Sequence, residues 1–146
     1  MSMYSGSCLC GSISYRIEGE LSEFGYCHCQ SCRKASGSAY GANIGVARSD
    51  LRLEDPKHHL KEFESSPGKI RTFCAQCGSP LFAYLKATPG LVRIRLGSLD
   101  SDLGKTAKAH TFVGDKADWD VIEGSIPQFD AWADKSVLIQ TGSRQK

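Results

Sequence analysis

The 146-residue sequence has little net charge and no long apolar run, and both absences narrow the possible functions. Its 18 lysines and arginines are nearly balanced by 16 acidic residues, which gives a formal net charge of +2. Proteins that bind nucleic acid or an anionic membrane surface typically carry an excess of positive charge, which this sequence does not have. No apolar stretch approaches the roughly 20 residues that a membrane-spanning helix needs. We therefore expect neither nucleic acid nor a membrane as a partner.

Helical periodicity is also scarce, and most apolar residues alternate with polar ones, as in half-buried strands. Strands are expected at 12–17, 39–47, 70–73, 81–85, 91–96 and 109–113, with turns at Gly19, 55–56, 67–68, 88–90 and Gly104. Arg93 and Arg95 are expected on the solvent side of their strand. Only two short helical turns are expected, at 31–36 and 126–133.

Short strands separated by turn residues predict an all-β, mainly antiparallel fold. The length fits a single domain over residues 1–146, with a core at about 1–135 and a polar C-terminal tail at 136–146.

The distinctive feature of this sequence is its seven cysteines, which fall into three tight clusters. They are Cys8-Leu9-Cys10, Cys27-His28-Cys29-Gln30-Ser31-Cys32 and Cys74-Ala75-Gln76-Cys77. An odd count does not suit a disulfide framework, and the start of the chain lacks signal-peptide features. We expect a reducing, cytoplasmic setting, because thiolate ligands oxidise elsewhere. Metal binding is favoured; an iron–sulfur cluster is the alternative to zinc.

Two cysteine pairs have the spacing of one closed tetrahedral zinc site. Cys8 and Cys10 are expected on one face of extended chain, and Cys74 and Cys77 bracket a turn that Gly78 follows. Together they supply the four thiolates of a structural site that closes a long loop. We expect Cys8, Cys10, Cys74 and Cys77 to hold a structural zinc.

The remaining cysteines, Cys27, Cys29 and Cys32, supply three ligands for a second zinc. Three protein ligands leave a fourth position for an exogenous group, whereas a closed Cys3His site would take His110. His28 is expected to face away from its neighbours. A metal held by three thiolates is better suited to binding a soft thiolate than to splitting water.

Charged and aromatic residues near these clusters have several possible roles. Arg33 and Lys34 are surface charges, or they offset a negative metal centre or hold an anionic substrate. The adjacent histidines His58 and His59 are expected to be solvated. The aromatic residues Phe112, Trp119 and Phe129 are expected in the core or at its edge, or over the second zinc.

These motifs resemble the glutathione-dependent formaldehyde-activating enzyme family, which includes centromere protein V. The resemblance lies in 6–11 with Tyr15, in 27–33 and in 73–81, and continues through 97–100, 110–113, 118–119 and 127–129. It implies an Mss4-like β-tent fold with one zinc on the four paired cysteines and one on the remaining three.

The same resemblance implies a carbon–sulfur lyase that joins or splits a thiol and an aldehyde, such as glutathione and formaldehyde. Cys27, Cys29 and Cys32 would then act as ligands of an open, catalytic zinc. The alternative is a binding module without catalysis, in which both zinc ions are structural.

Overall fold

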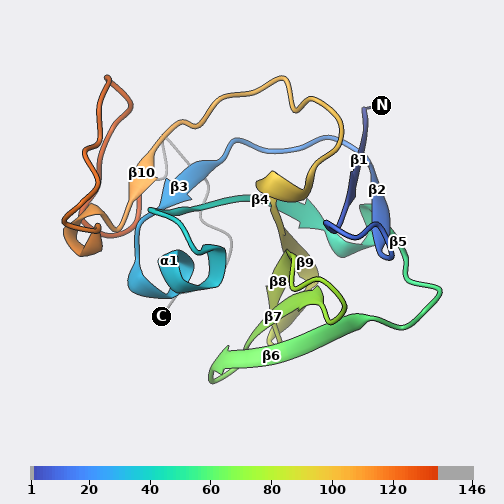
Figure 1. Ribbon diagram of the computed structural model, residues 1–146. Helices are drawn as coiled ribbons and strands as arrows, with labels where there is room; N and C mark the ends of the chain where they lie inside the picture. The colour runs from blue at the N-terminus through green and yellow to red at the C-terminus, as the bar shows by residue number, and fades with distance from the viewer. Residues whose placement is uncertain (1, 135–146) are drawn as a thin grey trace. The chain divides into compact units, whose positions relative to one another are not determined.

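The computed structural model describes residues 2–134, so the expected tail at 136–146 lies outside the described residues. The chain divides into two compact units, each made of two separate segments (Figure 1). Unit 1 contains Met1–Ser22 and Ile44–Gly104, and unit 2 contains Glu23–Asn43 and Lys105–Lys146. The single zinc domain over 1–146 stays a prediction.

Unit 1 is built from antiparallel strands. One three-stranded sheet has the order β1 (Met3–Ser7), β2 (Ser14–Glu18) and β5 (Leu51–Glu54). A second group pairs in chain order, β6 (Leu60–Ser66), β7 (Lys69–Cys74), β8 (Pro80–Leu85) and β9 (Thr88–Arg95). Two 3₁₀ helices, η1 (Arg48–Asp50) and η2 (Leu96–Ser98), follow strands of this unit.

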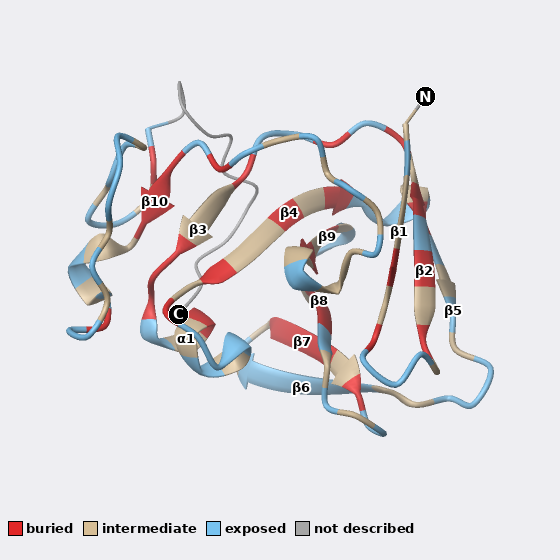
Figure 2. Cartoon of the chain, turned by 45° about the horizontal axis from the view of Figure 1, so that its top comes forward, coloured by how far each residue is buried: buried red, intermediate tan, exposed pale blue. Residues whose placement is uncertain are grey.

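The core of unit 1 consists of inward-facing branched aliphatic side chains from alternate strand positions, which suits the period-two pattern. The most buried are Ile13, Ile17, Ile44, Leu81, Val92 and Ile94. Strand β6 is exposed over most of its length, whereas its neighbour β7 is mostly buried (Figure 2).

Unit 2 is smaller and holds the only α-helix of residues 2–134. Strand β3 (Gly25–Cys27) pairs antiparallel with the first three residues of β4 (Gly41–Ala47), and parallel with β10 (His110–Thr111). Helix α1 (Gln30–Ser36) follows β3, and the 3₁₀ helix η3 (Val113–Asp115) follows β10. Strand β4 contributes its last four residues to unit 1.

The all-β, mainly antiparallel fold with a short helical turn is confirmed. Each expected strand region contains a strand, although the boundaries differ by a few residues, and α1 lies where the turn at 31–36 is expected. Over residues 2–134, no helix has the length and apolar character needed to cross a membrane.

Two local expectations are wrong. The stretch 126–133 is not helical, because its backbone pairs with β10: the His110 amide donates to the Pro127 carbonyl at 2.8 Å and the Phe129 amide donates to the His110 carbonyl at 2.9 Å. Proline also disfavours helix at the residue before it. Residues 88–90 begin β9 instead of forming a turn, since the β8–β9 turn lies at 86–87.

Candidate metal centres

The four paired cysteines come together in unit 1. The sulfur atoms of Cys8, Cys10, Cys74 and Cys77 all lie within 4.8 Å of one another, a grouping that can hold a metal ion. Cys8 and Cys10 lie in the loop between β1 and β2, where the Gly11 amide donates to the Cys8 carbonyl at 3.1 Å. Their sulfurs, 3.6 Å apart, therefore converge through a turn and not through the extended strand that the sequence predicts.

The other two cysteines of this group, Cys74 and Cys77, lie at a tight turn that begins at the end of β7. The Gly78 amide donates to the Cys74 carbonyl at 2.7 Å, which closes the turn around Cys77. Gly78 has φ of 79°, a left-handed conformation that glycine adopts without the steric cost of a Cβ. This turn places the Cys74 sulfur 3.8 Å from that of Cys10, across 64 residues of sequence.

Two serine hydroxyls surround these sulfurs. The Ser12 hydroxyl lies 3.8, 3.3 and 3.5 Å from the sulfurs of Cys8, Cys10 and Cys74. The Ser79 hydroxyl lies 3.2 Å from the Cys77 sulfur and accepts from the Leu9 amide at 2.8 Å. Hydrogen bonds from the Ser79 hydroxyl and amide lower the pKa of Cys77 to about 5. Hydroxyl donors thus favour the thiolate form that a metal ion requires.

His59 also belongs to the surroundings of this group, which the sequence analysis missed. Its Nδ1 lies 3.1 Å from the Ser12 hydroxyl, and its carbonyl accepts from the Ala75 amide at 2.7 Å. The carboxylate of Asp55 fixes the backbone here by accepting from the His59 amide at 2.8 Å. The expectation that His58 and His59 are both solvated therefore fails for His59, while His58 is exposed. No local pattern reveals this contact, because Ser12 is 47 residues away.

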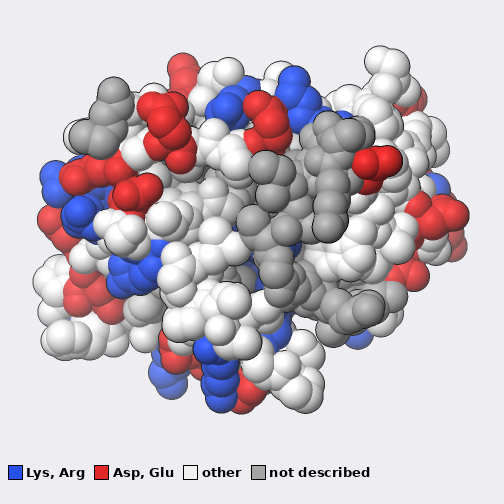
Figure 3. Space-filling view, turned by 180° about the vertical axis from the view of Figure 1, so that it is seen from behind, with Lys and Arg blue, Asp and Glu red and all other residues white. Residues whose placement is uncertain are grey.

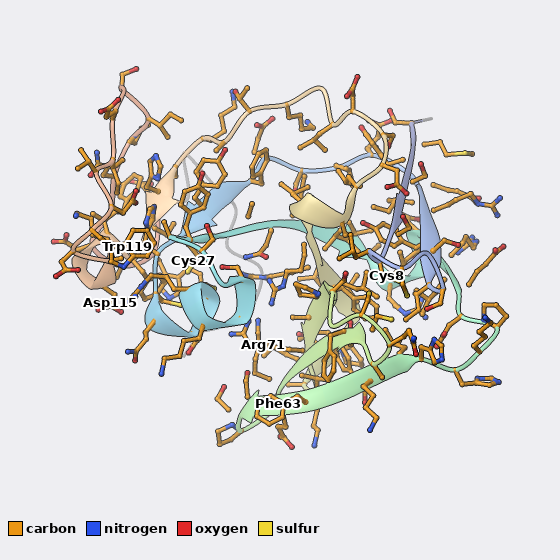
Figure 4. All side chains as sticks on the ribbon, viewed as in Figure 1. Cys8, Cys27, Phe63, Arg71, Asp115 and Trp119 are labelled. Carbon is orange, nitrogen blue, oxygen red and sulfur yellow. The ribbon has the colours of Figure 1, made fainter. Side chains whose placement is uncertain are left out.

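The other three cysteines form a second group in unit 2. The sulfurs of Cys27, Cys29 and Cys32 lie within 4.8 Å of one another, and all three residues are buried (Figure 4 labels Cys27). Hydrogen bonding with Cys29 and Cys32, together with burial, raises the pKa of Cys27. Three buried sulfurs cannot all be anionic without a compensating cation, so the donor set fits a soft metal ion.

Local structure brings this trio together. Cys27 ends β3, Cys29 is the N-cap of α1 and accepts from the Cys32 amide at 3.4 Å, and Cys32 lies in the helix. Strand β4 passes close by at Gly41, where an added Cβ would lie 3.2 Å from the Cys32 Cβ. Glycine is the residue that permits this approach of the β4 backbone.

An aromatic ring packs against the trio. Phe112 contacts the cluster and has φ of 56°, which is unusual for a bulky residue. Its amide donates to the Ala131 carbonyl at 2.9 Å, and the ring of Trp132 meets it edge-on at 5.1 Å. Phe112 therefore lies over the second group, which is one of the two positions that the sequence predicts for it. Trp119, in contrast, is 68% exposed.

The two histidines of unit 2 bind each other. His28 Nε2 lies 2.9 Å from His110 Nδ1. Both residues are buried, and the ring of Tyr40 contacts His28 while that of Tyr26 contacts His110. Burial lowers the pKa of both imidazoles, so the pair is held in the neutral form, in which one ring donates to the other. His28 Nδ1 lies 4.0 Å from the Asp120 carboxylate.

Among residues 2–134, no histidine or carboxylate joins the trio within 4.8 Å. The His110 Nδ1 atom faces His28, which leaves its Nε2 as the atom that a closed Cys3His site would use. Arg33 extends from α1 to η3, where its Nη2 donates to the Asp115 carbonyl at 3.1 Å. Lys34 is exposed.

The described residues on the face of the molecule in Figure 3 form no patch of one charge sign. Acidic and basic side chains are intermixed over the described residues on the face of the molecule in Figure 3. The absence of a nucleic-acid partner stays a prediction that this distribution favours.

Comparison with known proteins gives a consistent result. Residues 3–115 match the family described as "Glutathione-dependent formaldehyde-activating enzyme". An uncharacterized lyase of Schizosaccharomyces pombe is 31% identical over 85 residues, which are 58% of this chain and 60% of that protein. A Rhodobacter sphaeroides protein of known crystal structure shares the fold, with a TM-score of 0.57 and 22% identity over 73% of this chain and 99% of that one.

Proposed function

The chain belongs to the glutathione-dependent formaldehyde-activating enzyme family, and from this premise we propose that it is a zinc-dependent carbon–sulfur lyase. Its substrate would be the adduct of a small thiol, such as glutathione, and an aldehyde, such as formaldehyde. In the lytic direction the carbon–sulfur bond breaks and the sulfur leaves as thiolate. The hydroxyl on the same carbon loses its proton, and a carbonyl forms. The reverse reaction joins the two molecules.

The observation that carries this proposal is the second cysteine group. Cys27, Cys29 and Cys32 offer three buried sulfurs, and no fourth ligand joins them among the described residues. Held there, zinc would supply positive charge that keeps a thiolate ionised at neutral pH. The four paired cysteines would hold a second, structural zinc.

The surrounding residues suit a thiolate-binding site. Phe112 packs on the trio and limits access of water, which strengthens electrostatic interactions between sulfur and metal. The N-cap role of Cys29 directs its sulfur toward the first-turn amide of Cys32, and this hydrogen bond stabilises negative charge on sulfur. The neutral pair His28–His110 adds no competing cation beside the sulfurs.

Thiol titration of the cobalt-substituted protein tests this function. If a position is open, glutathione should strengthen the sulfur-to-cobalt charge-transfer band, and Cys32→Ser should abolish the change. The same samples should release formaldehyde from S-hydroxymethylglutathione, followed by NMR. A spectrum that stays flat across millimolar glutathione and other small thiols would favour the binding module with two structural zinc ions.

Two histidine variants distinguish this proposal from the alternative of a closed Cys3His site. If His110 were the fourth ligand, His110→Ala would lower the content of the second metal, whereas His58→Ala, at an exposed position, would not. Under our proposal both variants keep two metal ions per chain.

A further inference from the structure

The two cysteine groups differ in how open they are to solvent. Cys10 is exposed and Cys77 is half-buried, and both belong to the four-cysteine group of unit 1. The cysteines of the three-cysteine group, Cys27, Cys29 and Cys32, are all buried. A reagent dissolved in water therefore reaches the four-cysteine group more readily than the three-cysteine group.

Cys10 and Cys77 occupy equivalent places in two similar turns. Gly11 follows Cys10, and Gly78 follows Cys77. The amide of each glycine donates to the carbonyl of the first cysteine in its pair, at 3.1 and 2.7 Å. A Cβ added to either glycine would meet no atom within 4 Å, so there is open space beside both cysteines.

Only one cysteine of each turn is open to solvent. The other members of the two pairs, Cys8 and Cys74, are 4% and 0% exposed. Leu9, directly before Cys10, is 87% exposed. Its amide donates to the Ser79 hydroxyl at 2.8 Å, which ties the two turns to each other.

The two open cysteines lie close together. Their sulfur atoms are within 4.8 Å of each other, and the Cys10 amide donates to the Cys77 sulfur. A disulfide bond is about 2.05 Å long, so its formation needs the sulfurs to approach by less than about 3 Å. Both residues lie in turns and not in strands, so no pairing between strands opposes this movement.

One other pair of sulfurs is closer. The sulfurs of Cys8 and Cys10 are 3.6 Å apart. Only one residue separates these two cysteines, however, and a disulfide between them would close a small, strained ring. The geometry therefore favours a bond between the turns over one within the first turn.

We propose that Cys10 and Cys77 form a site of reversible oxidation, at which a peroxide joins the two turns by a disulfide bond. The Cys10 thiolate attacks one oxygen of hydrogen peroxide and breaks the O–O bond, which leaves a sulfenic acid and releases hydroxide. The Cys77 thiolate then attacks this sulfur and displaces a second hydroxide. The two thiolates lose two electrons, and the two hydroxides take up protons to become water.

This disulfide takes two of the four thiolates from the group. Cys8 and Cys74 remain, and two ligands are too few for a closed tetrahedral site, so a metal ion held there is released. The three-cysteine group keeps all its thiolates. Oxidation thus acts on the group to which we assign stability, and the proposal does not depend on lyase activity.

Mild oxidation of the zinc-loaded full-length protein by hydrogen peroxide tests the proposal. After increasing times, free thiols are alkylated under denaturing conditions, and proteolysis with mass spectrometry locates the disulfides and the labelled cysteines. We expect a Cys10–Cys77 disulfide while the three-cysteine group is still labelled in full. A chromogenic chelator should record release of about one zinc ion of two, and dithiothreitol with added zinc should restore both.

Two matched variants test the role of exposure. Cys8→Ala and Cys10→Ala each remove one thiolate from the same turn, but only the second removes the exposed one. Peroxide should still form the Cys10–Cys77 disulfide in Cys8→Ala. In Cys10→Ala no disulfide should join the two turns, because Cys8 is buried. If either variant does not fold, the mapping of the wild-type protein decides the proposal by itself.

Three results with the wild-type protein would overturn the proposal. One is oxidation of the three-cysteine group before Cys10 and Cys77, since exposure would then not determine reactivity. Another is a main product in which Cys10 is bonded to Cys8 or Cys74. The third is survival of all seven thiols in peroxide.

Discussion

Replacing Cys74 by serine tests whether the four paired cysteines stabilise unit 1 through a metal ion. The Cys74 sulfur lies 3.8 Å from that of Cys10, which is 64 residues away, so a metal ion shared by them closes a long loop. The chain-entropy relation for a cross-link of that length gives about 4 kcal/mol. Structural zinc in small peptides contributes more, on the order of 10 kcal/mol, of which a three-ligand remnant would keep part.

A loss of about 4 kcal/mol is a large share of the roughly 5–15 kcal/mol by which a domain is stable. For a chain of this size it lowers the melting temperature by roughly 10–15 °C. Differential scanning calorimetry of wild type and Cys74→Ser, each with zinc and with a strong chelator, measures this. Because Cys74 is fully buried, burying the serine hydroxyl also destabilises the fold. The difference in melting temperature between wild type and Cys74→Ser in chelator measures that effect alone.

Cys29→Ser is the matched control, since it makes the same chemical change in a group whose ligands are only a few residues apart. The loop that it opens is short, so its entropic effect is smaller. The reasoning is refuted if Cys74→Ser melts within about 2 °C of wild type in zinc, or if zinc and chelator give equal melting temperatures for wild type.

Three other changes probe the cysteine groups. Cys29→Ser should reduce the metal content from about two ions per chain to about one while the fold persists, measured by elemental analysis and circular dichroism; loss of both ions would contradict the division into two sites. Gly41→Ala should weaken only the second ion, because its Cβ would press on Cys32 at 3.2 Å; chelator competition would show two equally retained ions if this is wrong. Ser12→Ala should lower the affinity of the four-cysteine group for its metal ion by about 10–100-fold, the usual effect of losing a hydrogen-bond partner of the ligands, and unchanged chelator kinetics would exclude that role.

The sequence predicts the cysteine grouping well because the spacing is local. Cys27, Cys29 and Cys32 need only six residues of chain to converge, and the turn at Cys74–Gly78 carries its own glycine. Short-range geometry thus explains how the cysteines converge within each cluster, whereas the joining of Cys8 and Cys10 with Cys74 and Cys77 spans 64 residues and is predicted from the number of ligands alone. The structure brings together the same two sets. Their role as zinc ligands stays a prediction.

What the sequence does not predict depends on contacts between distant segments. The stretch 126–133 pairs with His110 through its backbone, and this competition overrides the weak helix signal there. Alternation places Arg93 on the polar side of β9, but it cannot show that the same side of the neighbouring β7 is buried. His59 reaches Ser12, and His28 reaches His110, across 47 and 82 residues.

The division of unit 2 into two distant segments fixes an order of events during synthesis. The three cysteines of the second group leave the ribosome early, yet Phe112, which packs against them, belongs to the segment that follows residue 104. Until that segment arrives, the thiols stand uncovered, although they are close enough in sequence to bind metal. All four cysteines of the first group have been made by then, since Cys77 is the last of them. A chain that emerges from its N-terminus onward can therefore close the four-cysteine group before Phe112 covers the three-cysteine group, to which we assign the chemistry.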